Sequence, residues 1–425
     1  MDLEDIAKLT SAQGRYLLDS LPEYAPELAI KLGDGLRQRG IDPKLAAAAL
    51  TQSRLRQRAR AKFGQFADQM LFTDEALQQA TRLEVAAHHA QRYQEAGMDR
   101  LTDLTGGIGG DALAMAALGL RVTVYERDPA RAAVAQFNLA AFPEAKVINE
   151  DFRTSTQNLR GALFADPSRR NTDGKRQFDP NGYDPPLPLL LELARDHPMG
   201  IKVAPGLPHR HIPAQAEAQW VSVDGSLVEA GLWFGALRSP GIDPTGSGPH
   251  RTALALRHGR AHHLAANPAC PTSVPTSQPT ALAASAPAGR LSTGPLNDYI
   301  YEPDDAVIRA SLIAEAAAGL GSANLVSPRI AYVTSSARVT ESPFLTGYQV
   351  QDSFPFSLKR LKSYLREHGI GQVTVKKRGT AVDPHDLRRR LNLKGNEPAV
   401  VILTRLGAQQ SVVIAQALPK PKESP

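Results

Sequence analysis

Residues 101–128, LTDLTGGIGGDALAMAALGLRVTVYERD, decide the fold that we expect for this chain of 425 residues. The pattern predicts a short apolar strand, a glycine-rich turn, a helix closed by Gly119, and a second strand over 121–125 that ends on Glu126. Glycines let the backbone turn sharply and approach a ligand closely, and the start of the helix offers unbonded N–H groups. An acid at the tip of the second strand can hold a ribose diol. The stretch therefore predicts a nucleotide-type pocket in a parallel sheet.

Strand and helix signals continue to alternate beyond this stretch. The expected helices cover 129–142 and 188–194, and the expected strands cover 146–149, 162–164 and 200–204. This alternation predicts an α/β fold with a doubly wound, Rossmann-like core. Three more strands, which we expect to close the sheet in antiparallel fashion, lie near 220–223, 227–234 and 252–257.

Composition and periodicity divide the chain into five expected regions. These are an N-terminal helical region (1–95), the α/β core (96–262), a Pro/Ala/Ser/Thr-rich linker (263–297), a connecting helix and strand segment (298–348) and a small basic α+β domain (349–418). The connecting helix is expected over 304–320. The last domain is expected to hold helices at 357–368 and 384–391 and strands at 372–376, 399–403 and 411–415.

Charge and composition exclude several classes of protein. The single cysteine argues against a disulfide framework or a cysteine-built zinc site. No apolar run approaches the roughly 20 residues that span a bilayer, and the start MDLEDIAKLT does not resemble a signal peptide. We therefore expect a soluble, cytoplasmic protein with no metal and no membrane partner.

The net charge of +6 is concentrated near the C-terminal end. Residues 351–410 hold 12 Lys or Arg and five Asp or Glu. Such a local excess favours a polyanionic partner. Three consecutive arginines, 388–390, spread around a helix, so a solvated face and a phosphate contact are equally compatible with them. The same holds for Arg54, Arg58 and Lys62, which share one face of an expected helix.

The glycine stretch has two interpretations that differ in cofactor. A dinucleotide fingerprint fits if it is read from Gly107 with Ala112 in its last position. The alternative includes Asp103, and the run DLTGGIGGD then closely resembles motif I of class I S-adenosylmethionine-dependent methyltransferases. This resemblance implies S-adenosylmethionine as cofactor, with Asp103 supporting its amino-acid end. The residues that the resemblance assigns to cofactor binding are Asp103, Thr105, Gly106, Gly107, Gly109, Glu126 and, near the adenine amine, Asp151.

A second motif, Asp166-Pro167-Ser168-Arg169, follows the expected strand at 162–164. It is similar to the N/D-P-P-Y/F tetrapeptide of methyltransferases that act on planar nitrogen, which makes Asp166, Pro167 and Arg169 the catalytic candidates. Asp166 is expected to accept a hydrogen bond from the target amine. Ser168 and Arg169 depart from the pattern, so base stacking fails or falls to the guanidinium. Arg169 and Arg170 are alternatively suited to clamp a phosphate or carboxylate.

The segments QQATRLEVA, DLTGGIGGD, ADPSRR, IKVAPG and DYIYEPDDAVIRA, with the tail from VKKRGTAVDPHDLRRRLNLKG to AVVILTR, resemble a bacterial family of class I methyltransferases with a C-terminal THUMP-like domain. The resemblance implies RNA binding through the basic domain and methyl transfer to a base nitrogen. C5-pyrimidine chemistry is disfavoured because it needs a cysteine nucleophile and Cys270 lies in the linker. Three alternatives stay open: a methyltransferase for a small molecule or protein, a non-catalytic RNA-binding protein, and an NAD(P)-linked oxidoreductase.

His88 and His89 lie next to each other on a strong expected helix over 78–93. Adjacent helical residues point in different directions, which argues against a shared metal. We expect both to be partly exposed helix residues.

Overall fold

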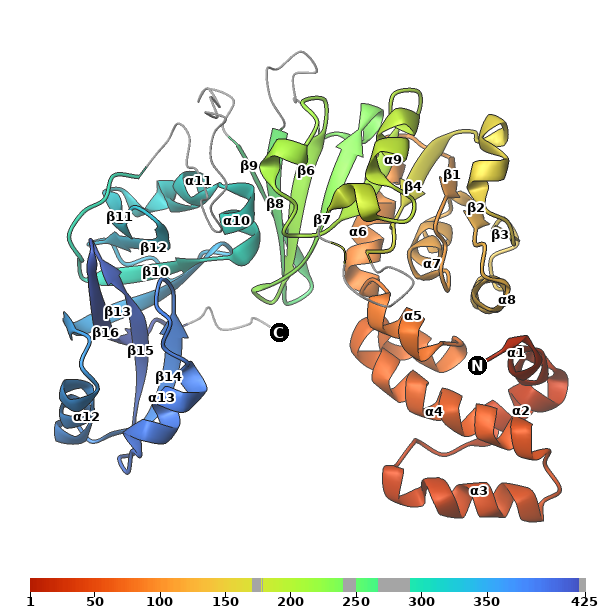
Figure 1. Ribbon diagram of the computed structural model, residues 1–425, viewed down its shortest axis with the longest axis horizontal. Helices are drawn as coiled ribbons and strands as arrows, with labels where there is room; N and C mark the ends of the chain where they lie inside the picture. The colour runs from red at the N-terminus through yellow and green to blue at the C-terminus, as the bar shows by residue number, and fades with distance from the viewer. Residues whose placement is uncertain (170–176, 178, 240–249, 267–290, 420–425) are drawn as a thin grey trace. The chain divides into compact units, whose positions relative to one another are not determined.

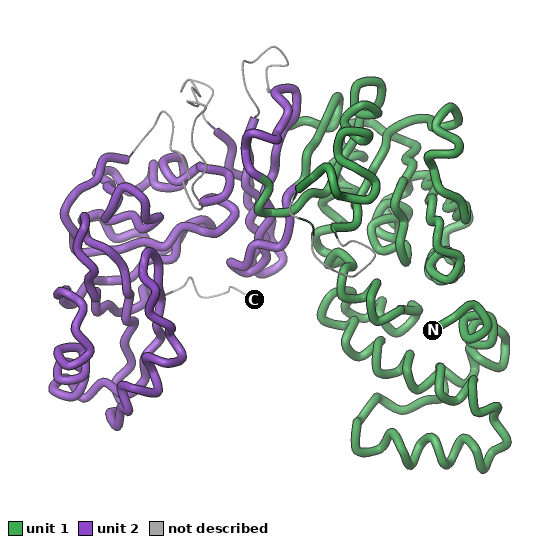
Figure 2. The backbone as a smooth tube through the Cα atoms, in the orientation of Figure 1, with its two compact units in different colours: residues 1–207, 231–242 green, residues 208–230, 243–425 purple. Residues whose placement is uncertain are grey.

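The computed structural model describes residues 1–169, 177, 179–239, 250–266 and 291–419. The chain forms two compact units (Figure 2). Unit 1 comprises Met1–Leu207 and Gly231–Ile242, and unit 2 comprises Pro208–Ala230 and Asp243–Pro425. The proline-rich segment predicted as a linker falls largely on 267–290, so it lies outside the described residues together with Cys270, as does Arg170.

Unit 1 begins with helices, as the sequence predicts. They are α1 (Leu3–Thr10), α2 (Ala12–Ser20), α3 (Ala29–Gln38), α4 (Pro43–Phe63), α5 (Asp74–Gln79) and α6 (Leu83–Glu95). Local signals set their ends: Asp2 and Asp5 form a capping box at α1, and Pro43 opens α4. Leu9, Leu55 and Phe63 are fully buried in the same apolar cluster as residues of the sheet.

Five parallel strands form the core of unit 1 (Figure 1). They are β1 (Arg100–Asp103), β2 (Arg121–Tyr125), β3 (Lys146–Ile148), β4 (Ala162–Ala165) and β5 (Met199–Val203), in the order β3-β2-β1-β4-β5. The connecting helices are α7 (Gly110–Ala117), α8 (Pro129–Asn138) and α9 (Leu187–Leu193). This arrangement confirms the doubly wound core.

The sheet continues with β6 (Glu217–Val223), β7 (Ser226–Phe234), β8 (His250–Arg257) and β9 (Arg260–Ala265), and its full order ends β5-β7-β6-β8-β9. The expected antiparallel closing end is partly wrong, because β6 and β8 are parallel. Asp224 and Gly225, both at positive φ, reverse the chain after β6. The pair of β8 with β9 is antiparallel, and β9 is a strand that the sequence pattern did not indicate.

Unit 2 holds a separate seven-stranded sheet in the order β11-β12-β10-β13-β16-β15-β14. Its strands are β10 (Tyr299–Pro303), β11 (Ala323–Ser327), β12 (Ile330–Ser335), β13 (Leu345–Pro355), β14 (Ile370–Lys377), β15 (Glu397–Leu406) and β16 (Gln409–Ala417). Helices α12 (Leu358–Glu367) and α13 (Pro384–Leu391) pack on one face of it around Leu361, Leu387 and Val401. The predicted α+β character of the C-terminal domain is confirmed.

The helix expected over 304–320 is interrupted. It consists of α10 (Asp305–Ala310) and α11 (Ile313–Ala317), because Ser311 adopts a left-handed conformation with φ of 57°. A non-glycine residue in that region ends an α-helix. Among the helices described, none has the length and apolar character needed to cross a bilayer.

Candidate active site

The acids singled out in the sequence gather where the parallel strands end. Asp103 is the last residue of β1, Glu126 directly follows β2, and Asp166 directly follows β4. Asp151 comes shortly after β3. The carboxyl ends of parallel strands meet at one edge of a sheet, which is where open α/β sheets bind ligands. The topology therefore brings all four predicted acids to one edge.

The glycine loop is shaped by contacts that only small residues permit. The Gly106 N–H donates to the Tyr125 carbonyl at 2.9 Å, and a Cβ on Gly106 would lie 2.0 Å from Val124 Cγ1. Gly107 and Gly109 have φ of 57° and 82°, values that L-residues rarely adopt. Gly109 is also the N-cap of α7. The loop thus turns directly from β1 into the helix.

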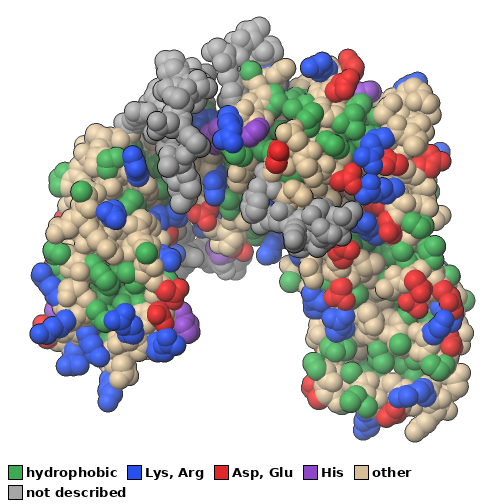
Figure 3. Space-filling view, in the orientation of Figure 1, with side chains coloured by type: hydrophobic (Ala, Val, Ile, Leu, Met, Phe, Trp, Pro, Cys, Tyr) green, Lys and Arg blue, Asp and Glu red, His purple; other side chains and the backbone are tan. Residues whose placement is uncertain are grey.

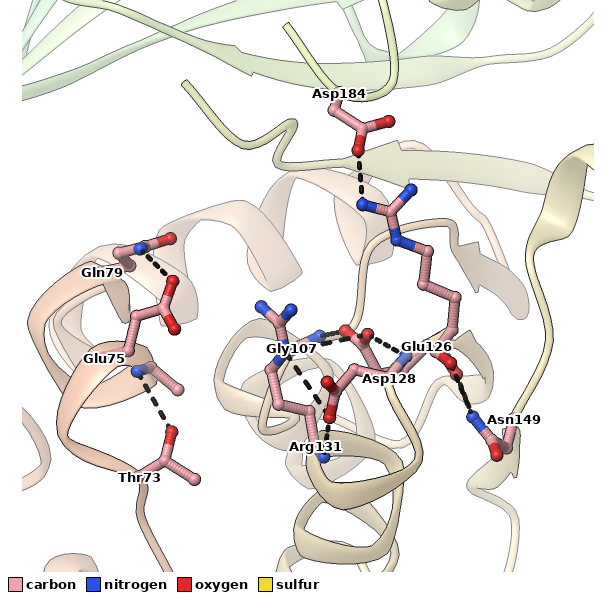
Figure 4. A network of polar contacts seen from close by, with 11 residues as sticks. Thr73, Glu75, Gln79, Gly107, Glu126, Asp128, Arg131, Asn149 and Asp184 are labelled. Carbon is pink, nitrogen blue, oxygen red and sulfur yellow. Dashed lines mark hydrogen bonds and ion pairs between the residues drawn. The ribbon is translucent and has the colours of Figure 1, made fainter. Parts of the chain in front are cut away.

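Glu126 ties this loop to the end of β2 (Figure 4). Its carboxylate accepts the N–H of Gly107 and the N–H of Asp128, each at 2.8 Å, and the side chain is buried. The two bonds fix the carboxylate beside the glycine turn. The sequence predicts a ribose contact for this acid, and that role stays a prediction.

Asp103 is 2% exposed and accepts the Thr105 N–H at 3.0 Å. Burial raises the pKa of this carboxyl to about 8, against the lowering effect of the Thr105 N–H. The nearby carboxylates of Asp111, Asp166 and Glu126 raise it further. Asp103 therefore keeps a proton at neutral pH that a cationic ligand would displace.

The Asp151 carboxylate is bound by Arg153, two residues further along the chain. It caps the short 3-10 helix Phe152–Thr154, and the Arg153 guanidinium, which bonds its carboxylate, lowers its pKa. Arg153 also lies 3.3 Å from Asp184, and Asp184 in turn pairs with Arg127 at 2.5 Å. The acid expected near an adenine amine is thus part of a chain of ion pairs along this edge.

The loop after β4 is joined to the glycine loop. The Asp166 N–H donates to Thr105 Oγ1 at 2.6 Å, and Pro167 is buried. Ser168 exchanges two backbone hydrogen bonds with Asp184, at 2.8 and 3.0 Å. Arg169 Nη1 is buried and finds no hydrogen-bond partner among the described residues. The structure thus brings Asp166 close to the predicted cofactor residues.

Sequence reasoning missed a buried charged cluster behind Asp166. Lys202 on β5 is 8% exposed, and its Nζ donates to Asp166 Oδ2 and to Thr81 Oγ1, both at 2.5 Å. Asp111 lies 3.8 Å from the same ammonium and accepts hydrogen bonds from Thr81 at 2.8 Å and from the His89 ring at 2.9 Å. The expectation of a partly exposed His89 is wrong, since this side chain is 2% exposed. The available signal was the lysine inside the apolar strand IKVA.

Lys202 and His89 determine the charge of Asp111 in this cluster. Burial by itself would raise the pKa of the Asp111 carboxyl, but the Lys202 ammonium and the His89 ring lower it to about 2. Asp111 is therefore ionised at neutral pH. One buried cation is shared by two carboxylates from different elements.

The basic face predicted on α4 contacts protein groups. Arg54 and Arg58 both pair with Asp74, at 2.8 and 2.7 Å. Lys62 Nζ donates to three backbone carbonyls at the end of α5, and burial lowers its pKa to about 8. These contacts favour an internal structural role for this face.

The donor set at the sheet edge suits a nucleoside that carries an amino acid. Asp103 and Glu126 place two buried acidic side chains at this edge, and the ligand groups expected for them are an ammonium and a diol. Gly107 leaves room beside its Cα, since a Cβ added there would have its nearest neighbour 4.0 Å away. The described residues contain no group of three or more His, Cys, Asp or Glu side chains placed to hold a metal ion.

Comparisons with known proteins identify relatives of this chain. Residues 345–417 match the THUMP domain-like family, and residues 2–59 match a domain of unknown function. Two Mycobacterium tuberculosis proteins, from strains CDC 1551 and H37Rv, are described as S-adenosylmethionine-dependent methyltransferases. Each is 34% identical over 364 residues, which cover 83% of this chain and 91% of the relative. The fold is similar to that of a candidate methyltransferase from Porphyromonas gingivalis W83, with a TM-score of 0.69, 18% identity, and coverage of 94% of this chain and 100% of that one.

Proposed function

The chain belongs to the S-adenosylmethionine-dependent methyltransferases, and from this premise we propose that it methylates a base nitrogen in RNA. The observation that carries the RNA substrate is the THUMP domain-like match over 345–417, because this domain also holds the excess of positive charge. Phosphate neutralisation by Lys and Arg supplies most non-specific nucleic-acid affinity.

S-adenosylmethionine is the cofactor, and when bound it supplies a methyl group already activated on a sulfonium. We assign its amino-acid end to Asp103, its ribose to Glu126 and its adenine side to Asp151. The backbone of Gly106, Gly107 and Gly109 and the hydroxyl of Thr105 complete the set. The two bonds to Glu126 and the buried setting of Asp103 support this assignment.

Methyl transfer to an activated donor needs positioning more than strong acid or base catalysis. In our proposal Asp166 accepts a hydrogen bond from the target amine and orients the nitrogen. This role is supported by the hydrogen bond from the Asp166 N–H to Thr105 Oγ1, because Thr105 belongs to the glycine loop that we assign to the methyl donor. Arg169, partly buried with one nitrogen unpaired among described atoms, is suited to hold a phosphate beside the target.

The surface that we assign to RNA, called the basic face below, lies on α12, β14, α13 and the segment after α13. Figure 3 shows Lys and Arg side chains gathered over α12 and α13. Seven Lys and Arg residues of the basic face form no ion pair with any other described residue: Lys359, Lys362, Arg366, Lys377, Arg388, Arg390 and Lys394. Arg389, by contrast, pairs with Asp386. Cations without acidic partners keep their charge available for phosphate.

Nucleoside mass spectrometry of total RNA from a deletion strain tests the proposal. We expect one methylated nucleoside to be missing and to return with the wild-type gene. Asp166→Ala should fail to restore this nucleoside. It should also lower the rate of methyl incorporation in vitro at least about 100-fold, because the hydrogen-bond acceptor for the target amine is lost. Its affinity for S-adenosylhomocysteine in calorimetry should stay close to wild type.

Asp196→Ala, which changes an exposed acid of unit 1, is the matched control and should restore the nucleoside fully. RNA that is identical in the deletion strain and its parent would contradict RNA methylation and favour a small-molecule or protein substrate. Equal incorporation by wild type and Asp166→Ala would remove Asp166 from its role. Calorimetry with NADH alongside S-adenosylhomocysteine tests the cofactor directly.

The salt dependence of RNA binding tests the basic face. Arg388→Gln/Arg390→Gln/Lys394→Gln should weaken binding to bulk tRNA and make the plot of log K against log salt shallower by about 2, because each lost phosphate contact removes roughly 0.7 to 0.9 from the slope. Electrophoretic mobility shifts at several salt concentrations measure this. Arg15→Gln/Arg37→Gln/Arg39→Gln removes the same charge from exposed N-terminal helix positions and should leave the slope unchanged. Equal slopes for both triple variants would contradict the assignment.

A further inference from the structure

Lys202 lies in the apolar strand β5, and the proposed methyl transfer assigns it no role. Its side chain is 8% exposed, and its ammonium is bonded to Asp166 Oδ2 and Thr81 Oγ1 at 2.5 Å each. A buried ammonium is costly unless charges and hydrogen bonds compensate it. The position of this group is therefore fixed by what surrounds it.

The rear of the cluster is anchored on helices. Asp111 sits in the first turn of α7, immediately after the glycine loop, and lies 3.8 Å from Lys202 Nζ. Thr81 links the two, since its hydroxyl donates to Asp111 and accepts from Lys202. His89 on α6 holds the other oxygen of Asp111 and packs between Phe164 and Trp233, with ring centroids 5.6 Å away from each.

The front of the cluster is the loop that carries Asp166. The side chain of Asp166 is about one-third exposed, whereas Lys202 and Asp111 are each about one-tenth exposed. The backbone of Asp166 is held by Thr105 at 2.6 Å. Asp166 is thus held by two groups: the Thr105 hydroxyl of the glycine loop binds its backbone N–H, and the Lys202 ammonium binds its carboxylate.

We propose that Lys202 is a positioning residue for methyl transfer, which holds the Asp166 carboxylate at the sheet edge and joins it through Asp111 to the helix that begins at the donor loop. This inference rests on the proposed role of Asp166 as acceptor for the target amine. A carboxylate that rotates away from the reacting nitrogen loses the alignment that in-line transfer requires. Lys202 acts only through Asp166 and does not touch the substrate.

The test compares full-length variants by two measurements. Lys202→Met/Asp111→Asn removes the buried cation together with the buried Asp111 carboxylate that lies 3.8 Å from it. The double variant is compared with three others: Lys202→Met alone, Lys202→Arg and Lys62→Met. Lys62 is a second half-buried lysine nearby, but it donates to main-chain carbonyls and not to Asp166. Hydrogen exchange is followed in peptides that cover 163–169, and kcat and KM are measured with RNA from the deletion strain.

In the double variant we expect faster exchange at 163–169, a kcat lower by about 100-fold, and an unchanged KM and affinity for S-adenosylhomocysteine. Lys202→Arg should recover part of the turnover, and Lys62→Met should match wild type in both measurements. Wild-type exchange and wild-type kcat in the double variant would overturn the proposal, and so would a loss that Lys202→Arg does not relieve at all. If wild-type protein transfers no methyl group to RNA, the proposed function fails, and the exchange comparison alone decides whether Lys202 holds Asp166.

Discussion

Asp103→Asn is expected to weaken the binding of S-adenosylhomocysteine at least about tenfold while stabilising the fold at alkaline pH. The loss of affinity follows because hydrogen bonds to charged groups contribute about 1.5–3 kcal/mol and an amide offers no charge to an ammonium. The gain in stability follows from burial, which raises the pKa of Asp103 from 3.8 to about 8. The same residue thus serves binding at the expense of the free energy of unfolding.

The sign of the pH effect can be worked out. Between pH 4 and pH 8 the unfolded chain has an ionised Asp103 and the folded chain a protonated one, so ionisation favours unfolding as the pH rises. The stability advantage of Asp103→Asn over wild type should therefore grow by up to about 1.4 kcal/mol per pH unit in this window and level off above pH 8. It should vanish below pH 4. The asparagine Oδ1 can still accept the Thr105 N–H, so the loop is preserved.

Urea unfolding at pH 5, 7 and 9 measures this slope, and calorimetry measures the affinity. Asp99→Asn is the control, because Asp99 is an exposed carboxylate just before the same strand. It should change neither quantity appreciably. A stability difference between Asp103→Asn and wild type that is the same at all three pH values would contradict the argument.

Gly106→Ala should destabilise the protein by about 3 kcal/mol and abolish cofactor binding with it. The new Cβ would lie 2.0 Å from Val124 Cγ1, inside the packed contact between the glycine loop and β2. Overpacking a well-packed core costs about 1–3 kcal/mol and at times more. The displaced loop would also lose the bond from Gly106 to Tyr125.

Two variants separate this clash from a general effect of alanine in the loop. Gly107→Ala has no atom closer than 4.0 Å to its Cβ but sits at φ of 57°, so it should cost only about 1–2 kcal/mol. Gly106→Ala/Val124→Ala removes the clashing methyl group and should recover cofactor binding relative to Gly106→Ala. Denaturant midpoints and calorimetry measure both. If Gly107→Ala proved more damaging than Gly106→Ala, backbone conformation and not packing would govern the loop.

The core of unit 1 could be predicted because its signals are local. The glycine turn and the β-branched run 121–125 each act within a few residues, and they indicated the right elements in the right order. The acids at the strand ends could be predicted for the same reason, since Asp103, Glu126 and Asp166 each lie at the end of a strand or directly after it. The roles that we give to these acids stay predictions.

The features that could not be predicted from the sequence depend on contacts between segments that are far apart in the chain. Thr81, Asp111 and Lys202 are far apart in the chain, and only the packing of α6, α7 and β5 brings them together. The strand β13 escaped notice because its outward positions are polar and its partners, β10 and β16, lie far from it in sequence. The parallel pairing of β6 with β8 likewise follows from strand order, which no local pattern encodes.

The bond between Thr105 and the Asp166 N–H has a thermodynamic consequence. It joins the loop that we assign to the methyl donor with the loop that we assign to the acceptor, so a ligand that shifts one loop also changes the free energy of the other. Coupling between two binding sites is reciprocal. The factor by which the donor changes the affinity for RNA must therefore equal the factor by which RNA changes the affinity for the donor, and replacement of the Thr105 hydroxyl should bring both factors toward one.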